Sequence, residues 1–391
     1  MRFDRLHDQA KSLIKWLFKP VREIKWLSDP IRRQFHFTDF VSYHQAAKGK
    51  NTRNLRVLLP AQRVTISYPA TDPFVPVGKL YREGWFDRPD IFVCEVPGAH
   101  FYVYDGIICT RDLEVLCDIE PRIPQYRHHI HKKPRAVRKG LIRQRAGLYS
   151  SINAIAAGNH YHWMVDALPK IHSLAKYEPK EKVTIVMPDT IGPVQKETLA
   201  CVLPANFQVE YHPRKTWLHF ETFLLPSLVS GYYNAFLPAE YYESIRRPIF
   251  ERFHLPAVHT QTERLYLSRR GARLRRVLNE EAVVALLQPY GFKTVELEKL
   301  SFREQVELFH RADILVGPSG AAFNVLMFCG KVRAVVLHPN QVPENFFHTL
   351  AHGLGQDYHF VLHHEGNDDD FEVNLGALKR VLDEELSLRS S

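Results

Sequence analysis

The sequence predicts an α/β fold with two parts, because short apolar strands alternate with helical patterns along much of its 391 residues. The alternation is clearest over residues 264–339, where strands and helices follow one another in turn. A chain of this length also holds enough apolar residues for two separate cores. We therefore expect an N-terminal α/β domain over residues 36–245, a C-terminal domain over residues 246–391, and a helical extension over residues 1–35.

The composition is that of an ordinary globular protein, with 45% hydrophobic and 24% charged residues. No run of about eighteen apolar residues occurs, so we expect no membrane-spanning helix. The N-terminus lacks the apolar core and the small-residue cleavage site of a secretory signal. Five cysteines without CxxC spacing are typical of reduced thiols. Together these features predict a cytoplasmic protein.

The net charge of +9 is concentrated in two segments. Residues 1–35 hold nine Lys and Arg against four Asp and Glu, and residues 122–145 hold nine more with no acidic residue. Such segments indicate binding to an anionic surface or to anionic substrates. We do not expect a nucleic-acid partner, because the sequence contains no recognised nucleic-acid-binding motif.

The first basic segment is typical of an amphipathic helix. Its apolar residues recur at roughly helical spacing, surrounded by lysines, arginines and two tryptophans, Trp16 and Trp26. Such a helix either lies in the interface of an anionic membrane, or docks on its own protein or on a second copy of the chain in a homo-oligomer. Pro20 would kink this helix or split it in two.

The N-terminal half contains further predicted elements. Apolar runs punctuated by Pro and Gly predict a hairpin-rich set of strands between Leu55 and Asp118. The basic residues 122–145 predict a loop or an exposed helix. The remaining elements are a helix at about His162–Lys176, a strand at Val183–Met187, strands near Phe207–Tyr211 and Phe223–Leu225, and an interdomain connection over residues 237–262.

In the C-terminal half, two predicted strands end in residues that suit an anion site. The strand Leu265–Ser268 runs into Arg269 and Arg270. The strand Asp313–Val316 runs into a glycine-containing turn, Gly317–Ala321, which opens a helix. Ligands of parallel α/β sheets lie beyond the carboxyl ends of the strands. We therefore expect the arginines and the turn at one ligand site.

These residue types indicate a binding site for a diphosphate group, and hence for a nucleotide. A glycine turn that opens a helix presents free N–H groups and a positive dipole end to an anion, and an arginine can clamp a phosphate bidentately. Neighbours on an extended chain point in opposite directions, so one arginine, Arg269, is expected to reach the phosphates. The residues expected to bind the nucleotide are Ser268, Arg269, Arg270, Gly317, Ser319, Gly320, Ala321, Asn324 and Glu344.

Two of these residues have a structural alternative. Asn324 either reaches the sugar or ribose of the nucleotide or packs on a helix face. Glu344 either accepts a hydrogen bond from a ribose hydroxyl or favours the dipole of the helix that it opens. That helix is expected to end at Gly353–Gly355, and a last helix is expected at about Leu375–Leu386.

A second constellation, Gly158–Asp166, holds candidates for a general base. A glycine turn leads into a helix whose first turns carry His160, His162 and Asp166. Residues four apart share a helical face, so His162 and Asp166 can face one site. A helix N-terminus lowers the pKa of carboxylates and histidines, which leaves both able to accept a proton at pH 7. Three alternatives stay open: Asp166 only orients a histidine, His160 is structural, or the set holds a metal ion.

Three blocks resemble glycosyltransferase family 61: GNHYHWMVDALPKI at 158–171, the stretch 266–328 and NFFHTLAHGLGQDYHFV at 345–361. The resemblance covers roughly residues 145–385. It implies a GT-B fold, in which two Rossmann-like domains face each other across a cleft. One position departs from the family, which usually carries a histidine in a Gly-Pro-His-Gly-Ala block where this chain has Ser319.

The resemblance implies an inverting, metal-independent hexosyl- or pentosyltransferase. It would move sugar from a nucleotide-sugar co-substrate, a UDP-sugar, to a glycan hydroxyl without another cofactor. Asp166 is the implied base, with His160 and His162 as competitors. We expect a cytoplasmic enzyme, peripheral on a bacterial inner membrane, that acts on a lipid-linked precursor of capsule or lipopolysaccharide. The alternative, which Ser319 keeps open, is an inactive protein that binds a nucleotide or a glycan.

Overall fold

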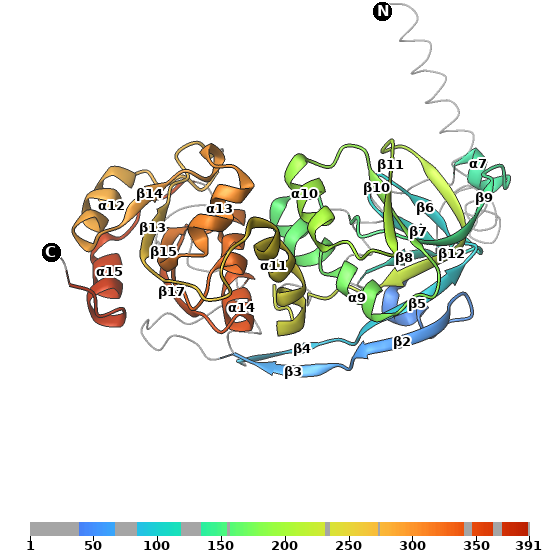
Figure 1. The fold of residues 1–391 in the computed structure, drawn as a ribbon, viewed down its shortest axis with the longest axis horizontal. Coiled ribbons are helices and arrows are strands. Elements are labelled where there is room, and N and C mark those ends of the chain that lie inside the picture. The colour runs from blue at the N-terminus through green and yellow to red at the C-terminus, as the bar shows by residue number, and fades with distance from the viewer. Residues whose placement is uncertain are drawn as a thin grey trace, which may run out of the picture.

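The computed structural model describes residues 39–66, 84–118, 134–154, 157–230, 235–272, 274–339, 346–362 and 370–389. Within these ranges the chain forms two lobes, each around one β-sheet, and a separate two-stranded ribbon (Figure 1). The chain is therefore a mixed α/β protein, as the alternation of strands and helices predicted. The helix predicted over residues 1–35 lies outside the described residues.

The N-terminal sheet is only partly parallel. Its order is β1-β8-β7-β6-β12-β9-β10-β11, and β5 pairs with both β12 and β2. The neighbours β12, β9, β10 and β11 run parallel, whereas β12 pairs antiparallel with β5 and β6. A Rossmann-like arrangement was expected for this half, and only those four parallel strands resemble one. The strands are β1 (Phe40–Ser42), β2 (Arg53–Leu59), β5 (Ile91–Pro97), β6 (His100–Tyr102), β7 (Ile107–Cys109), β8 (Val115–Cys117), β9 (Gln144–Ser150), β10 (Val183–Pro188), β11 (Phe207–His212) and β12 (Trp217–Pro226).

Three local predictions in this half need correction. Strand β9 begins at Gln144, inside the segment predicted as a loop or exposed helix, and it pairs with β10 and β12. The helix predicted at about His162–Lys176 is broken into α8 (His160–His162), the π-helix η2 (Trp163–Ala167) and α9 (Lys170–Lys176). Residues 237–262, predicted as a connection, contain a long helix, α11 (Ala239–Phe253).

The C-terminal sheet confirms the predicted parallel order. Its five described strands follow the order β14-β13-β15-β16-β17, and every pair is parallel. A reciprocal capping box of Ser301 and Glu304 starts helix α13, and Gly355, at φ +64°, follows the end of α14 as predicted. The elements are β13 (Glu263–Leu267), α12 (Glu280–Leu287), η3 (Gln288–Tyr290), β14 (Lys293–Val295), η4 (Leu297–Lys299), α13 (Phe302–Phe309), β15 (Ala312–Pro318), η5 (Ala321–Phe328), β16 (Arg333–His338), α14 (Phe346–Gly353), β17 (Asp357–Leu362), α15 (Leu375–Arg380) and η6 (Val381–Glu385).

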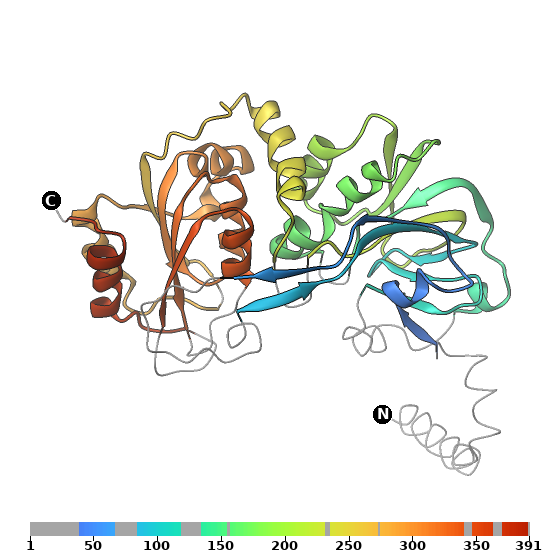
Figure 2. The same ribbon diagram turned by 90° about the horizontal axis from the view of Figure 1, so that it is seen from below.

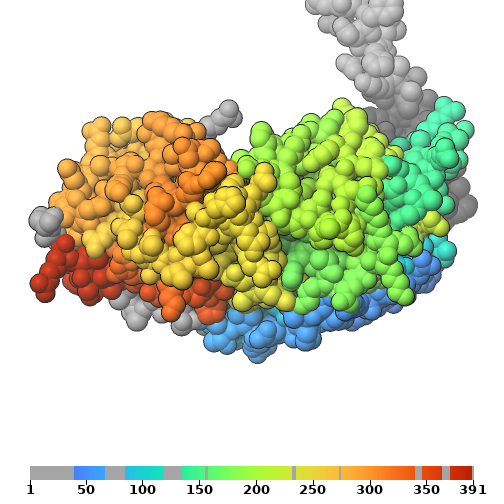
Figure 3. Space-filling model, in the orientation of Figure 1, coloured from blue at the N-terminus to red at the C-terminus, as the bar shows by residue number. Residues whose placement is uncertain are grey.

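Helix α11 lies between the two lobes. It packs on α10 (Pro193–Val202) of the N-terminal lobe and on η5 of the C-terminal lobe. One continuous cluster of buried apolar side chains includes Leu224 from the first sheet, Tyr242 from α11 and Leu315 from the second sheet. The surfaces of the two lobes meet around this helix, drawn in yellow (Figure 3). Burial of shared apolar surface therefore holds the two lobes together.

A two-stranded ribbon extends from the N-terminal lobe towards the C-terminal lobe (Figure 2). It consists of β3 (Gln62–Thr65) and β4 (Trp85–Arg88), which pair antiparallel. The ring of Phe86 packs on Phe236, and Phe236 packs on His352 of α14.

Among the described residues, no helix has both the length and the apolar character that crossing a membrane requires. The other short helices are α4 (Tyr43–Ala46) and α7 (Arg135–Arg138).

Candidate active site

His162 and Asp166 form a hydrogen-bonded pair. Nδ1 of His162 lies 2.6 Å from Oδ2 of Asp166. The hydroxyl of Ser230 donates to the other carboxylate oxygen of Asp166, Oδ1, across 2.5 Å. The Asp166 carboxylate is buried, whereas the His162 side chain is 33% exposed. The carboxylate therefore lies behind an imidazole that solvent and substrates can reach.

The helix that carries this pair is irregular. Asn159 caps its start, because its side-chain oxygen accepts from the N–H of Tyr161 across 2.8 Å. The π-helical turn η2 is closed by a bond from the N–H of Leu168 to the carbonyl of Trp163. Pro169 follows and has no N–H with which to continue an α-helix. Wide turns of this kind are frequent at functional sites.

His160 is the first residue of α8 and is partly buried. Burial lowers the pKa of its imidazole from the ordinary value. The ring is therefore neutral at pH 7, as the sequence predicted. The structure thus offers His160 as a neutral histidine and His162 as a histidine paired with a carboxylate.

Arg269 lies against the glycine turn, as its place after strand β13 predicted. A Cβ atom on Gly320 would be 2.2 Å from Nη1 of Arg269, so only a glycine leaves room for this guanidinium. Nη2 of Arg269 donates to the carbonyl of Leu274 across 3.1 Å, and its Nε is buried without a hydrogen-bond partner. Burial, and next the nearby cation Arg275, lower the pKa of Arg269. This arrangement suits a guanidinium that binds an anion.

Arg270 points to a different partner. Its Nε donates to Oε2 of the buried Glu280 across 3.0 Å, and its side chain is 63% exposed. Glu280 also accepts from the hydroxyl of Tyr266 across 3.1 Å. The hydroxyl of Ser268 accepts from the backbone N–H of Arg270 across 3.2 Å. Ser268 and Arg270 therefore shape the end of β13, and Arg269 is the arginine directed to the turn.

The glycine turn presents polar groups that have no partner within the described chain. The N–H of Ser319 donates to the carbonyl of Leu337 across 2.8 Å, but its hydroxyl is buried without a hydrogen bond. Both amide atoms of Asn324, in η5, are likewise buried without a partner. Burial of an unsatisfied polar group costs about 1–3 kcal/mol, so such groups are common where a ligand completes the hydrogen bonds.

The turn itself is tightly packed. Gly317 lies in β15, where a Cβ atom would be 2.8 Å from Cβ of Leu267 in the neighbouring strand. Ala321 begins η5, which is a 3₁₀-helix and not the regular α-helix that a glycine turn usually opens. Strand packing therefore requires glycine at 317, whereas at 320 a glycine leaves room for the guanidinium of Arg269 in the position that it occupies.

The two sequence blocks meet in the structure. Helix α8 contacts η5 directly. The ring of Tyr161, next to His162, packs on Phe346 and Phe347 of α14 with ring centres 5.5 and 5.9 Å away. Phe347 in turn packs on Phe323 of η5. A chain of aromatic contacts therefore fixes the His162–Asp166 pair beside the glycine turn.

Sequence reasoning missed two residues of this arrangement. Ser230 lies 64 residues from Asp166 in the sequence, and no motif marks its hydroxyl as a partner of the carboxylate. The sequence did not single out Arg275, which is close enough to lower the pKa of Arg269 and that of the buried His338. Its neighbour Arg276 binds Asp370 instead.

The predictions for Glu344 and for metal binding remain to be compared with the structure. Glu344 lies outside the described residues, so its place relative to the turn stays a prediction. For metal binding, the described residues contain no group of three or more His, Cys, Asp or Glu side chains arranged to hold an ion.

Comparison with known families agrees with this geometry. Residues 160–336 match the family described as Glycosyltransferase 61. The match begins at His160, spans Asp166 and includes the turn from Gly317 to Ala321. No curated protein matches the chain. The match over these residues, which includes both sequence blocks that meet in space, shows that this part of the chain is similar to glycosyltransferase family 61.

Proposed function

We propose that the chain is an inverting glycosyltransferase that moves a hexosyl or pentosyl group from a UDP-sugar to a hydroxyl of a glycan. The contact between α8 and η5 carries this proposal. It sets a carboxylate–imidazole pair beside a turn that holds a buried arginine and unsatisfied polar groups. Glycosyl transfer needs both parts, a base for the acceptor and a binding site for the leaving diphosphate.

His162 acts as the general base in this proposal. The Asp166 carboxylate accepts a hydrogen bond from Nδ1–H of His162, so the proton of the neutral imidazole stays on Nδ1. Nε2 is then free to take the proton of the acceptor hydroxyl. The alternative of a base at Asp166 itself fits less well, because both of its oxygens are occupied by the donors of His162 and Ser230. A positioned base of this kind contributes about 10²–10⁴-fold to the rate.

Arg269 stabilises the leaving group. The acceptor oxygen bonds to the anomeric carbon as the bond from that carbon to the diphosphate oxygen breaks, and the electron pair goes to the diphosphate. Arg269 and Arg275 face the developing charge, and the Ser319 hydroxyl donates to it. Asn324 supplies its free amide to the sugar or the ribose. With the charge met by these side chains, we propose a reaction that needs no divalent ion.

The acceptor and the cellular location extend the proposal. The basic segment 1–35 supports a peripheral place on an anionic membrane, which would be the cytoplasmic face of a bacterial inner membrane. A glycan hydroxyl on a lipid-linked precursor of capsule or lipopolysaccharide would then be within reach.

The proposal is tested by nucleotide release. The purified chain is incubated with individual UDP-sugars, with and without extracted lipid-linked glycans, and free UDP is measured. We expect release that depends on the acceptor and falls at least about 100-fold in His162→Ala. Binding of UDP in a thermal-shift assay, without release from any donor and acceptor pair, would instead support the inactive nucleotide-binding protein that Ser319 leaves open.

A further inference from the structure

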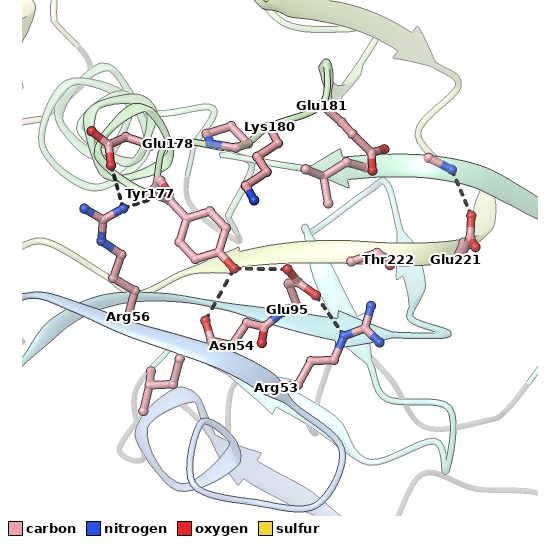
Figure 4. A pocket seen from close by; sticks show the side chains of 14 residues that line it. Arg53, Asn54, Arg56, Glu95, Tyr177, Glu178, Lys180, Glu181, Glu221 and Thr222 are labelled. Atoms are coloured by element: carbon pink, nitrogen blue, oxygen red, sulfur yellow. Dashed lines mark hydrogen bonds and ion pairs between the residues drawn. The ribbon is translucent and has the colours of Figure 1, made fainter.

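A cavity of about 790 Å³ opens in the N-terminal lobe. Its walls come from β2, β5, β9, β12 and the segment that follows α9 (Figure 4). His162 and Asp166 do not line this cavity, and neither do the residues of the glycine turn, Gly317–Ala321. The family match and the proposed reaction leave this cavity without a role.

The centre of the cavity is a fixed hydrogen-bond network. Glu95 accepts from the hydroxyl of Tyr177 across 3.0 Å and from Nε of Arg53 across 2.8 Å. Burial raises the pKa of Glu95, but hydrogen bonds from Asn54, Arg53 and Tyr177 outweigh it, so the net shift is downward. Burial, and next the charge of Glu95, raise the pKa of Tyr177 to about 12. Glu95 is therefore a permanent acceptor and Tyr177 keeps its proton.

A second set of contacts extends this network around the wall. Nη1 of Arg56 donates to Oε2 of Glu178 and to the carbonyl of Tyr177, both across 3.0 Å. The carboxylate of Glu221 accepts from the N–H of Gly147 across 3.1 Å. The side chain of Lys180 extends into the space between these groups (Figure 4). Donors and acceptors therefore alternate around the cavity.

The backbone is distorted at the points where it supplies these side chains. Asn54 and Glu178 are not glycines, yet their φ angles are +52° and +55°. The pairing of β2 with β5 shifts register between Arg53 and Arg56, and that of β12 with β9 shifts next to Glu221. Left-handed non-glycine residues and β-bulges cost free energy and recur at functional sites, where they redirect side chains. The backbone is thus distorted at three places around one cavity, which is typical of a functional site.

The charges of the side chains that line the cavity indicate which class of ligand it can bind. The lining holds three basic and four acidic side chains: Arg53, Arg56, Lys180, Glu95, Glu178, Glu181 and Glu221. Two of the three basic groups already pair with acidic ones within the cavity. A phosphate or a nucleotide would need an excess of cations, which this lining lacks. A neutral ligand with many hydroxyls both donates and accepts, and so matches alternating donors and acceptors.

We propose that this cavity binds a neutral saccharide at a site separate from that of the nucleotide-sugar. Asp166 and Tyr177 lie eleven residues apart, at opposite ends of the segment η2–α9. The cavity is thus a second carbohydrate site on the lobe opposite the glycine turn. This inference goes beyond the proposed transfer reaction and does not depend on it.

The experiment measures binding of the full chain to an array of immobilised neutral and uronic-acid-containing oligosaccharides, followed by calorimetry with the best neutral tetrasaccharide. We expect neutral glycans to bind the wild type. Glu95→Gln and Tyr177→Phe should each bind about tenfold or more weakly, since each loses a hydrogen bond that involves a carboxylate. Glu210→Gln is the matched control, because Glu210 pairs with Arg145 on the same sheet but does not line the cavity.

The outcomes separate this inference from the proposed function. Binding that survives in Glu95→Gln and Tyr177→Phe, binding restricted to acidic glycans, or no binding to the wild type would overturn the saccharide site. Arg269→Gln should keep glycan affinity while it loses UDP affinity. Glycan binding without any UDP release would leave the saccharide site standing and count against the transferase. If Glu95→Gln unfolds, as judged by circular dichroism, Tyr177→Phe decides the matter.

Discussion

The imidazole of His162 lies against the carboxylate of Asp166, with Nδ1 2.6 Å from Oδ2, at a turn where the helix widens. The Asp166 carboxylate is buried and also accepts from Ser230, so it cannot rotate freely to meet a substrate. The more exposed partner, His162, is the one that an acceptor can reach. This geometry supports the proposed division of roles, in which Asp166 positions His162 and His162 accepts the proton.

Asp166→Asn should abolish most activity without unfolding the protein. An amide at this position can donate to Nδ1 of His162 and so favour the tautomer that carries its proton on Nε2, which cannot act as a base. By analogy with other histidine bases, we expect kcat to fall about 10²–10⁴-fold, with UDP affinity unchanged. Steady-state UDP release and calorimetry measure the two quantities.

The control for Asp166→Asn is Glu240→Gln. Glu240 lies 3.6 Å from His172 and also binds Lys176, in the same lobe. It resembles Asp166 as a carboxylate beside a histidine, but it lies in the first turn of α11 and not in η2. Equal loss of kcat in both variants would show that the effect is a general loss of packing in this lobe.

Arg269 and Arg270 should differ sharply in nucleotide binding. Arg269→Gln removes the guanidinium that lies on Gly320, so we expect UDP affinity to fall about 10–100-fold. Arg270→Gln removes the partner of Glu280 and should lower thermal stability while UDP affinity stays near that of the wild type. Calorimetry with UDP and thermal unfolding, performed on both variants, check this. A larger loss of affinity in Arg270→Gln would contradict the assigned directions of the two side chains.

The sequence predicted the C-terminal half better than the N-terminal half, and the reason is physical. The last three residues of β13, LYL, and the centre of β15, ILV, are buried apolar runs followed by turn residues, which is typical of a buried parallel sheet. Strand β9, with the sequence QRAGLYS, begins with two polar residues, Gln144 and Arg145, and contains a glycine. It becomes a strand because β10 and β12 pair with it on both sides, and such pairing is not encoded locally.

At the candidate site, too, local features could be predicted from the sequence and long-range contacts could not. Alternation along an extended chain was enough to predict that Arg269 and Arg270 point in different directions, and helical spacing placed His162 beside Asp166. Ser230 could not be predicted, because its bond to Asp166 joins residues 64 positions apart. Arg275 was also missed, since its backbone is left-handed at φ +60°, and nothing in the sequence RLRR marks that turn. Long-range contacts therefore account for most of what sequence reasoning lacked.

Ser319→Ala should lower the affinity for UDP without lowering the stability of the protein. The hydroxyl of Ser319 is buried without a partner, so its removal should leave the free energy of unfolding unchanged or raise it by about 1 kcal/mol. UDP affinity should fall about fivefold or more, because the hydroxyl is proposed to donate to the diphosphate. Ser301→Ala is the opposite control, since it removes the capping box of α13 and should cost about 1 kcal/mol of stability with no change in affinity.

Stability should fall in mild acid because of buried histidines. Burial lowers the pKa of His100 to about 4, and burial together with Arg275 lowers that of His338 to about 3. Below about pH 6.5 the unfolded chain binds protons at these residues and the folded chain does not, so the free energy of unfolding decreases as the pH falls. Each histidine contributes a slope of up to about 1.4 kcal/mol per pH unit between its two pKa values.

Urea denaturation at pH 7.5 and pH 5 measures this slope. His338→Gln should reduce the difference between the two values, because it removes one of the titrating groups. His254→Asn is the control, since His254 is exposed at the end of α11 in a left-handed conformation that asparagine tolerates. A pH slope that is equal in the wild type and in His338→Gln would show that other groups cause the loss of stability.

Removal of residues 1–30 should release the protein from anionic membranes. This segment lies outside the described residues, and the prediction rests on its excess of basic residues and its two tryptophans. Each Lys or Arg near an anionic surface contributes about 1 kcal/mol to binding, and salt screens that contribution. The full chain should therefore sediment with vesicles that contain anionic lipid, less so at high salt, whereas the truncated chain should stay in the supernatant and keep its UDP affinity. Equal sedimentation of both forms would show that residues 1–30 do not anchor the protein to the membrane. A smaller oligomer after truncation, measured by light scattering, would indicate that the segment docks on a second copy of the chain.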